Sequence, residues 1–227
     1  MTGIYICLAV FFIVMCIYLY HIIFRENSHE KITKTATSVM FFITGVLSMV
    51  LTKSFSFSSI FMCLGLLFSI FGDFFLIKQL KIRHSFVIGV TFFFLAQISY
   101  ITAFTGSIPL RWFDFAVFGF IEGSAILTYK LMNFDAKSLK LPLLIYSSGL
   151  CFMAVKAVSF IFVRPFGIYH AFVVATGGIL FLISDSVLGY SIFSNRNSLK
   201  SRLVNLLTYY FGQILLAFSI FLMFMQY

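Results

Sequence analysis

Eight long apolar segments, separated by short loops, make up almost the whole chain. A transmembrane helix needs about 20 consecutive, mostly apolar residues, and each segment is close to that length. The segments lie near residues 3–24, 35–52, 56–77, 84–104, 112–130, 140–162, 167–190 and 203–226. This pattern predicts an all-α fold, an integral membrane helical bundle of eight transmembrane helices forming a single transmembrane domain over residues 1–227.

The chain also carries too few charges for a soluble domain. Charged residues make up 10% of the sequence and hydrophobic residues 61%, whereas a soluble domain is about 25% charged. The net charge of +9 does not indicate nucleic-acid binding, because the basic residues lie in short loops rather than in one patch or tail. The N-terminus lacks the basic region and cleavage site of a signal peptide, so the first segment is expected to remain as a span.

Lys and Arg residues concentrate in alternate loops. Twelve of the sixteen fall in the first, third, fifth and seventh loops. Cytoplasmic loops collect Lys and Arg, so these loops are predicted to face the cytoplasm, with both termini on the non-cytoplasmic side of the cell membrane. A miscount by one span would destroy the alternation. Lys156 lies inside a segment, near its outer end, and is expected to extend its ammonium group to the membrane surface.

Three carboxylates lie inside apolar segments: Asp73, Glu122 and Asp185. An acid near the centre of a spanning helix costs about 2.5–3.5 kcal/mol on insertion scales, and such acids usually face the bundle interior or a cavity. Asp73 and Asp185 lie at similar depth near the ends of two inward-running spans, and small residues on the same helix faces allow close packing. Both are therefore predicted to point into the bundle. For Glu122, pairing with Lys156 or a tyrosine stays open beside a functional role.

Polar side chains on neighbouring spans follow helical periodicity toward the same region. We therefore expect a polar-lined cavity, reached from the cytoplasmic half of the bilayer, with Asp73 and Asp185 as a catalytic pair. The remaining candidates for substrate contacts are Ser69, Gln97, Tyr100, Glu122, Tyr146, Ser184, Tyr209 and Gln213. A glycine precedes each aspartate by eight residues, and a span carrying a glutamine follows each. Two parallel four-helix repeats would explain this echo, and so would chance similarity between apolar sequences.

The two aspartates lie in the segments GLLFSIFGDFFLI and GGILFLISDSVLG, and the last span contains LVNLLTYYFGQILLAFS. These segments resemble the YhhN family of lysoplasmalogenase-like membrane proteins, and the resemblance covers nearly the whole chain. It implies hydrolysis of the vinyl-ether bond of lysoplasmalogen, giving a fatty aldehyde and a glycerophospho-head group, with Asp73 and Asp185 as the catalytic pair.

The chain departs from the family pattern at two places. The stretch KITKTATS lacks the family's proline, and Gln97 stands where the family usually has a histidine. A histidine can shuttle protons and a glutamine cannot, so the resemblance leaves activity and substrate open at this position.

Vinyl-ether hydrolysis begins with proton transfer to the alkene carbon and continues with addition of water to an oxocarbenium ion. It needs one carboxylic acid and one carboxylate that steadies the cation and activates water. No metal or cofactor is required, and the four histidines occupy positions from which no ligand cluster with the aspartates is expected. There is no G-x-S-x-G motif, and Ser184 and Ser186 lack a histidine base.

Other functions remain open from the sequence. The main rival is a membrane carrier or binding protein for a lipid or small molecule, in which the buried acids bind protons or a cationic head group. A scaffold without small-molecule activity is a third possibility. The aspartates could also be structural, bonded to hydroxyl groups on other helices. A lysophospholipid is the expected partner, and the sequence does not reveal the oligomeric state.

Overall fold

The computed structural model describes residues 2–24, 29–53, 55–77, 84–131, 140–194 and 198–224. All regular secondary structure in these ranges is helical, which confirms the all-α prediction. The eight helices are α1 (Thr2–Phe24), α2 (Glu30–Leu51), α3 (Phe57–Phe75), α4 (Ser85–Ser107), α5 (Trp112–Leu131), α6 (Lys140–Val163), α7 (Gly167–Phe193) and α8 (Leu199–Leu222). Seven are long and apolar enough to cross a membrane. The exception, α5, carries Asp114 and Glu122. The chain is a multi-span helical membrane protein.

Several helix ends follow local sequence signals. The hydroxyl oxygen of Ser56 accepts a hydrogen bond from the Ser59 backbone N–H at the start of α3, at 3.1 Å. Ser198 starts α8 in the same way, since N-terminal N–H groups of a helix need such acceptors. Pro109 follows the end of α4 and Pro165 follows the end of α6, where proline cannot continue a helix.

The second helix begins earlier than its apolar segment. It starts at Glu30 rather than at residue 35, so Lys31 and Lys34 lie in its first turns and not in a loop. The sequence pattern missed this start because KITKTATS is polar on most of its residues. The consequence is large, since Glu30 and Lys34 are buried against other helices.

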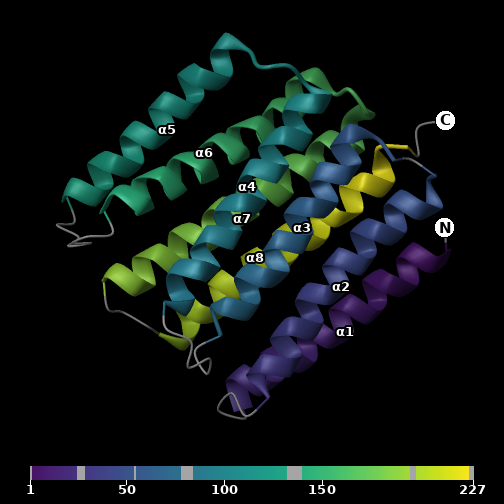
Figure 1. Ribbon diagram of the computed structural model, residues 1–227, viewed down its shortest axis with the longest axis horizontal. Coiled ribbons are helices and arrows are strands. Elements are labelled where there is room, and N and C mark those ends of the chain that lie inside the picture. The colour runs from purple at the N-terminus through teal and green to yellow at the C-terminus, as the bar shows by residue number, and fades with distance from the viewer. Residues whose placement is uncertain are drawn as a thin grey trace.

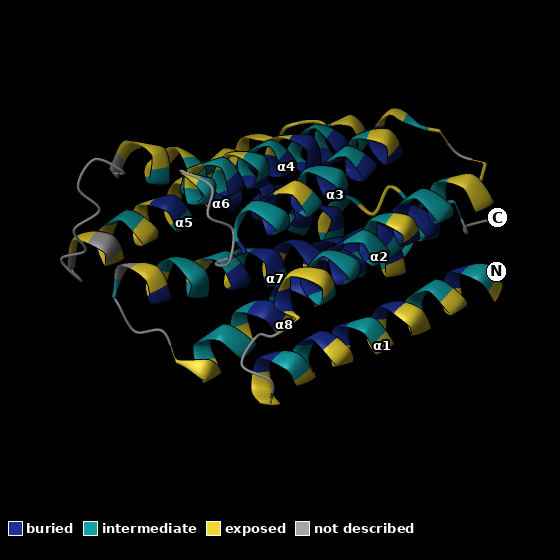
Figure 2. Cartoon of the chain, turned by 60° about the horizontal axis from the view of Figure 1, so that its bottom comes forward, coloured by how far each residue is buried: buried dark blue, intermediate teal, exposed yellow. Residues whose placement is uncertain are grey.

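The centre of the bundle consists of α3, α4, α7 and α8 (Figure 1). The contacts between α3 and α4 and between α7 and α8 are the most extensive. On one side α2 packs against α3 and α8, and α1 covers α2. On the other side α6 packs against α4 and α7, and within the described ranges α5 packs against α6 alone. Both outer helices, α1 and α5, expose much of their surface (Figure 2).

Glycines allow the two central pairs to approach closely. A methyl group at Gly212 of α8 would lie 3.0 Å from the carbonyl oxygen of Gly177 in α7. One at Gly89 of α4 would lie 3.2 Å from the carbonyl oxygen of Gly72 in α3. Small residues are the usual means of close helix packing in membranes. The two contacts are what a parallel repeat would give, and the repeat itself stays a prediction.

The helix α1 begins, and α8 ends, at the same end of the bundle (Figure 1). The side of the membrane that this end faces stays a prediction. Half of the basic residues used to orient the spans lie outside the described residues, namely Arg25, Lys78, Lys81, Arg83, Lys137 and Arg196.

Candidate functional site

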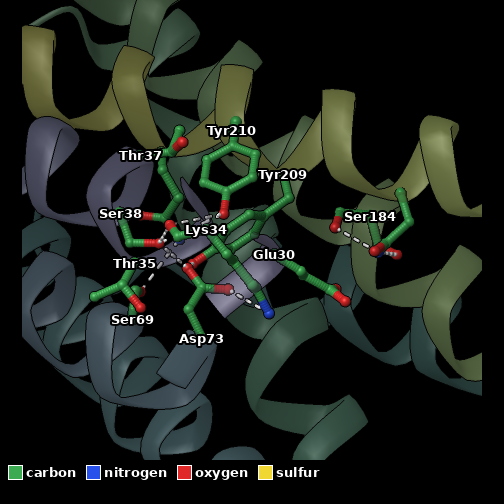
Figure 3. Close-up of polar contacts among 12 residues, drawn as sticks. Glu30, Lys34, Thr35, Thr37, Ser38, Ser69, Asp73, Ser184, Tyr209 and Tyr210 are labelled. Carbon is green, nitrogen blue, oxygen red and sulfur yellow. Dashed lines mark hydrogen bonds and ion pairs between the residues drawn. The ribbon is translucent and has the colours of Figure 1, made fainter. Parts of the chain in front are cut away.

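Asp73 is the centre of a buried group of polar side chains, as Figure 3 shows. Its carboxylate accepts hydrogen bonds from the hydroxyl groups of Ser38 at 2.6 Å and Tyr209 at 2.7 Å. The ammonium group of Lys34 lies 3.2 Å from its other oxygen. Three helices, α2, α3 and α8, therefore meet at one acid. We refer to Asp73, Lys34, Ser38 and Tyr209 as the Asp73 cluster.

The start of α2 forms a second ion pair close to this cluster. Arg202 of α8 donates to the carboxylate of Glu30, which is 6% exposed. Lys34 follows Glu30 by one helical turn, so the two buried charged residues of α2 are each paired with an opposite charge on another helix. A buried charge is tolerated only when it is paired and hydrogen-bonded in this manner.

Asp185 lies at a different kind of place. It is half-buried on α7 and lines a cavity of about 440 Å³ whose walls come mainly from α4, α5, α6 and α7. The hydroxyl group of Tyr146, on α6, donates a hydrogen bond to its carboxyl group. No Lys or Arg forms an ion pair with Asp185 among the residues that the structure describes.

The wall of this cavity is mostly apolar. Leucine, isoleucine, valine and phenylalanine side chains dominate it, so the prediction of a polar-lined cavity is wrong. The reason is that the polar stripes of the sequence bond to one another between helices and leave hydrocarbon side chains at the free surface. The charged and hydroxyl-bearing residues that remain in the wall are Lys130, Tyr146, Ser147, Asp185 and Ser186.

The two aspartates lie within electrostatic range of each other. Only Asp185 is part of the cavity wall, whereas Asp73 is 3% exposed and enclosed by its own cluster. Phe93 lines the cavity and packs edge-on against Tyr209, with ring centroids 5.7 Å apart. These two rings connect the cavity wall to the Asp73 cluster.

Three predicted substrate contacts bond to one another instead. The hydroxyl group of Tyr100 donates to the side-chain oxygen of Gln213 at 2.7 Å, and the amide nitrogen of Gln213 donates to Ser69 at 3.2 Å. All three side chains are fully buried, and none lines the cavity. They join α3, α4 and α8, which is a packing role.

Ser184 has a similar role between α7 and α8. Its hydroxyl oxygen and its carbonyl oxygen both accept from the side-chain amide of Asn205, at 3.0 and 2.8 Å. Figure 3 shows it well apart from the Asp73 cluster. Tyr146 is thus the predicted contact residue that lines the cavity with Asp185.

Gln97 is buried without a satisfied side chain. It is fully buried on α4, and neither its amide nitrogen nor its carbonyl oxygen has a hydrogen-bond partner among the described residues. Tyr146 lies close to it but not in good hydrogen-bond geometry. An unsatisfied buried polar group costs about 1–3 kcal/mol, so its retention calls for an explanation beyond packing.

The third buried acid and the buried lysine do not pair with each other. Glu122 of α5 accepts hydrogen bonds from Ser147 at 3.1 Å and Ser148 at 2.9 Å, both on α6. Lys156 pairs with Asp114 at 2.9 Å, with both side chains fully buried. The expectation that Lys156 extends to the membrane surface is wrong, because Asp114 at the start of α5 supplies a closer partner.

Some functional neighbours were not found from the sequence. Lys34 was assigned to a loop, although its spacing of four residues from Ser38 was a usable signal once helix α2 is extended. In the described part of the chain, no three His, Cys, Asp or Glu side chains are grouped as metal ligands.

The bundle has one carboxyl group in the wall of a cavity and a second carboxyl group buried close by. These features define a polytopic membrane protein whose interior carboxyl groups could transfer protons. The YhhN family model matches residues 30–220. The chain belongs to the YhhN family, as its two aspartate segments indicated. No curated protein and no solved structure matches it.

Proposed function

We propose that this protein hydrolyses the vinyl-ether bond of lysoplasmalogen, with Asp185 as the proton donor. The observation that supports this most is the position of Asp185 in the wall of an apolar cavity, bonded to Tyr146 and without a paired cation among the residues that the structure describes. A candidate acid must first reach the reacting atom, and of the two aspartates Asp185 is the one exposed to that space. Membership of the YhhN family is consistent with a lysoplasmalogenase-like role.

The reaction begins when Asp185 transfers a proton to the alkene carbon that is not bonded to oxygen. The π electrons form the new C–H bond, and the resulting oxocarbenium ion faces the Asp185 carboxylate. Water adds to the carbon bonded to oxygen, and the proton it loses returns to Asp185. In the hemiacetal, the hydroxyl proton moves to the ether oxygen as the C–O bond breaks, which releases the aldehyde and the glycerol hydroxyl.

In this proposal Asp73 does not touch the substrate and acts through its fixed negative charge. Lys34, Ser38 and Tyr209 fix its carboxylate, so it presents a preorganised negative charge within electrostatic range of Asp185. Fixed charges aimed at a developing cation stabilise the transition state without reorganisation.

Alkenyl, alkyl and acyl lysolipids incubated side by side with the purified protein in detergent test this function. Aldehyde release from the alkenyl lipid alone is the expected result. Asp185→Asn should abolish turnover with unchanged thermal unfolding. Asp73→Asn should reduce turnover strongly and also lower the unfolding temperature, because Lys34 loses its buried partner. The control is Ser186→Ala, which alters the next residue of the cavity wall. Full activity in either aspartate variant would overturn the proposal, and pH-dependent binding without product would favour a carrier.

A further inference from the structure

The outer helix α5 leaves a hollow surface between itself and α7. Within the described ranges α5 packs against α6 alone. Besides the cavity at Asp185, a second hollow of about 540 Å³ lies between α5, α6 and α7. We call it the outer groove, and it is lined by Val117, Ile121, Val158, Phe162 and Ile179, among others.

The cavity and the outer groove follow each other along the same helices. Leu182 of α7 lines both of them. On α7 the residues Asp185, Leu182 and Ile179 recur every three positions, which places them near one helix face. On α5 the two hollows extend from Lys130 to Phe113, about 25 Å at a rise of 1.5 Å per residue. Among the described residues, Leu182 is the one that both linings share, so we place the junction of the two hollows at Leu182.

Polarity changes along this path. Lys130 and Asp185 both line the cavity. The polar residue of the outer groove, Ser159, already donates to Asp114 at 2.6 Å. The path therefore has a charged end that suits a phosphate and an apolar end that suits hydrocarbon. That gradient matches an amphiphile with one chain.

We infer that the outer groove binds the hydrocarbon tail of a single-chain lysolipid, whose phosphate lies at Lys130 and whose first chain carbons pass Asp185. The role of Asp185 in cleaving that lipid rests on the proposed function, whereas the location of the tail does not. The two hollows follow each other as one path past Leu182, and a single-chain lipid suits one path better than a diacyl phospholipid with two chains.

Photo-crosslinking locates the tail without any need for turnover. The probe is an octadecyl ether lysolipid, which cannot be cleaved as a vinyl ether, with a diazirine at the chain end. Labelling of groove residues such as Val117, Val158 or Ile179, displaced by unlabelled lysolipid, is the expected result. The groove residues are themselves partly exposed, so displacement decides the result. Labelling of groove residues that unlabelled lysolipid does not displace, labelling confined to other surfaces such as that of Ile13 in α1, or equal displacement by a diacyl phospholipid would overturn the inference.

Leu182→Trp narrows the junction and provides the matching affinity test. Each buried methylene contributes appreciably to binding, so loss of a few should weaken binding of the octadecyl ether lysolipid about tenfold or more. Binding of the octyl analogue should change little, since its tail ends before the groove. Ile183→Trp changes the neighbouring residue, which is 41% exposed on the outside of the bundle, and serves as control. Equal losses for both chain lengths would contradict the inference.

These results are separable from the proposed function. Correct labelling with no aldehyde from the alkenyl lipid would reject the hydrolase and keep the tail site. Aldehyde release with labelling elsewhere would reject the tail site and keep the hydrolase.

Discussion

The ammonium group of Lys34 lies 3.2 Å from the carboxylate of Asp73 in the interior of the bundle, where the two side chains are 9% and 4% exposed. Their helices, α2 and α3, are consecutive in sequence, and this ion pair links them in the interior of the bundle. Ser38, one turn after Lys34, adds a hydrogen bond to the same carboxylate at 2.6 Å. The catalytic proposal depends on this arrangement, because it fixes the charge of Asp73.

Replacing Lys34 by methionine should lower the free energy of unfolding by about 3–5 kcal/mol, since Asp73 would keep a buried charge without its cation. The double variant Lys34→Met/Asp73→Asn should recover most of that loss and remain nearly inactive. Thermal unfolding of the purified protein measures the first effect and aldehyde release the second. Lys200→Met, at an exposed position of α8, is the control. An unfolding temperature equal to that of the parent in Lys34→Met would show that the ion pair does not contribute to stability.

Tyr209→Phe removes one of the donors to Asp73 while keeping the ring contacts. A hydrogen bond to a charged group contributes about 1.5–3 kcal/mol, so kcat should fall roughly 10- to 100-fold if that bond positions Asp73. Tyr210→Phe is a matched control, because the Tyr210 hydroxyl lies 3.5 Å from Ser38 and 3.4 Å from the Lys34 carbonyl oxygen and does not reach Asp73. Equal effects of the two changes would contradict a specific role for Tyr209.

Asp73, Asp185, Tyr146 and Tyr209 could be named from the sequence as candidates because polar groups stand out in apolar helices and recur at helical spacing. The structure places them in the Asp73 cluster or in the cavity wall. The burial of Asp73 with Gly65 and Ser69 on one face of α3 confirms that periodicity. Lys34 was missed because local polarity hid the start of α2. Periodicity assigns a face to a residue, but it does not say which helix that face meets.

The cavity was less predictable than the helices. Its volume depends on how side chains of five segments fill the space between them, and no single segment carries that information. Polar residues were expected to line it, yet Ser69, Tyr100 and Gln213 satisfy one another across three helices. Hydrogen bonds between helices make the burial of these polar groups tolerable. The same bonds hold the polar groups between helices, away from the cavity wall.

Gln97→Met should leave the protein equally stable or more stable and yet reduce turnover. The substitution removes an amide that has no partner in the described structure, so the cost of about 1–3 kcal/mol is relieved. Because Gln97 lies beside Tyr146, the amide is placed to hold Tyr146 or a reacting water near Asp185. The unfolding temperature should therefore stay the same or rise, while aldehyde release falls.

Gln213→Met is the comparison for that experiment. Gln213 accepts from Tyr100 and donates to Ser69, so its loss takes the acceptor from the buried Tyr100 hydroxyl and should destabilise the protein by about 1–3 kcal/mol. Ser69 keeps its hydrogen bond to the Gly65 carbonyl oxygen. A lower unfolding temperature for both variants would show that Gln97 also has a structural partner.

The last prediction concerns how α5 is held. The carboxylate of Asp114 accepts hydrogen bonds from the ammonium group of Lys156 at 2.9 Å and from the hydroxyl group of Ser159 at 2.6 Å. All three side chains are fully buried or nearly so. Since α5 packs against α6 alone in the described ranges, this pair and the Glu122 contacts are its polar attachments. Lys156→Met should cost about 3–5 kcal/mol, because Asp114 would be left charged and unpaired.

The effect should be local, and a reactive-thiol probe measures it. A cysteine at Val117, facing the outer groove, should become more accessible to a maleimide in Lys156→Met than in the parent. In Lys156→Met/Asp114→Asn the uncompensated charge is gone, so accessibility should return toward the parental rate. A cysteine at Leu66 of α3, fully buried in the centre, should stay unreactive in all three proteins, because the central helices do not depend on this ion pair. Reaction at both positions would mean that the whole bundle loosens and that α5 is not separately attached.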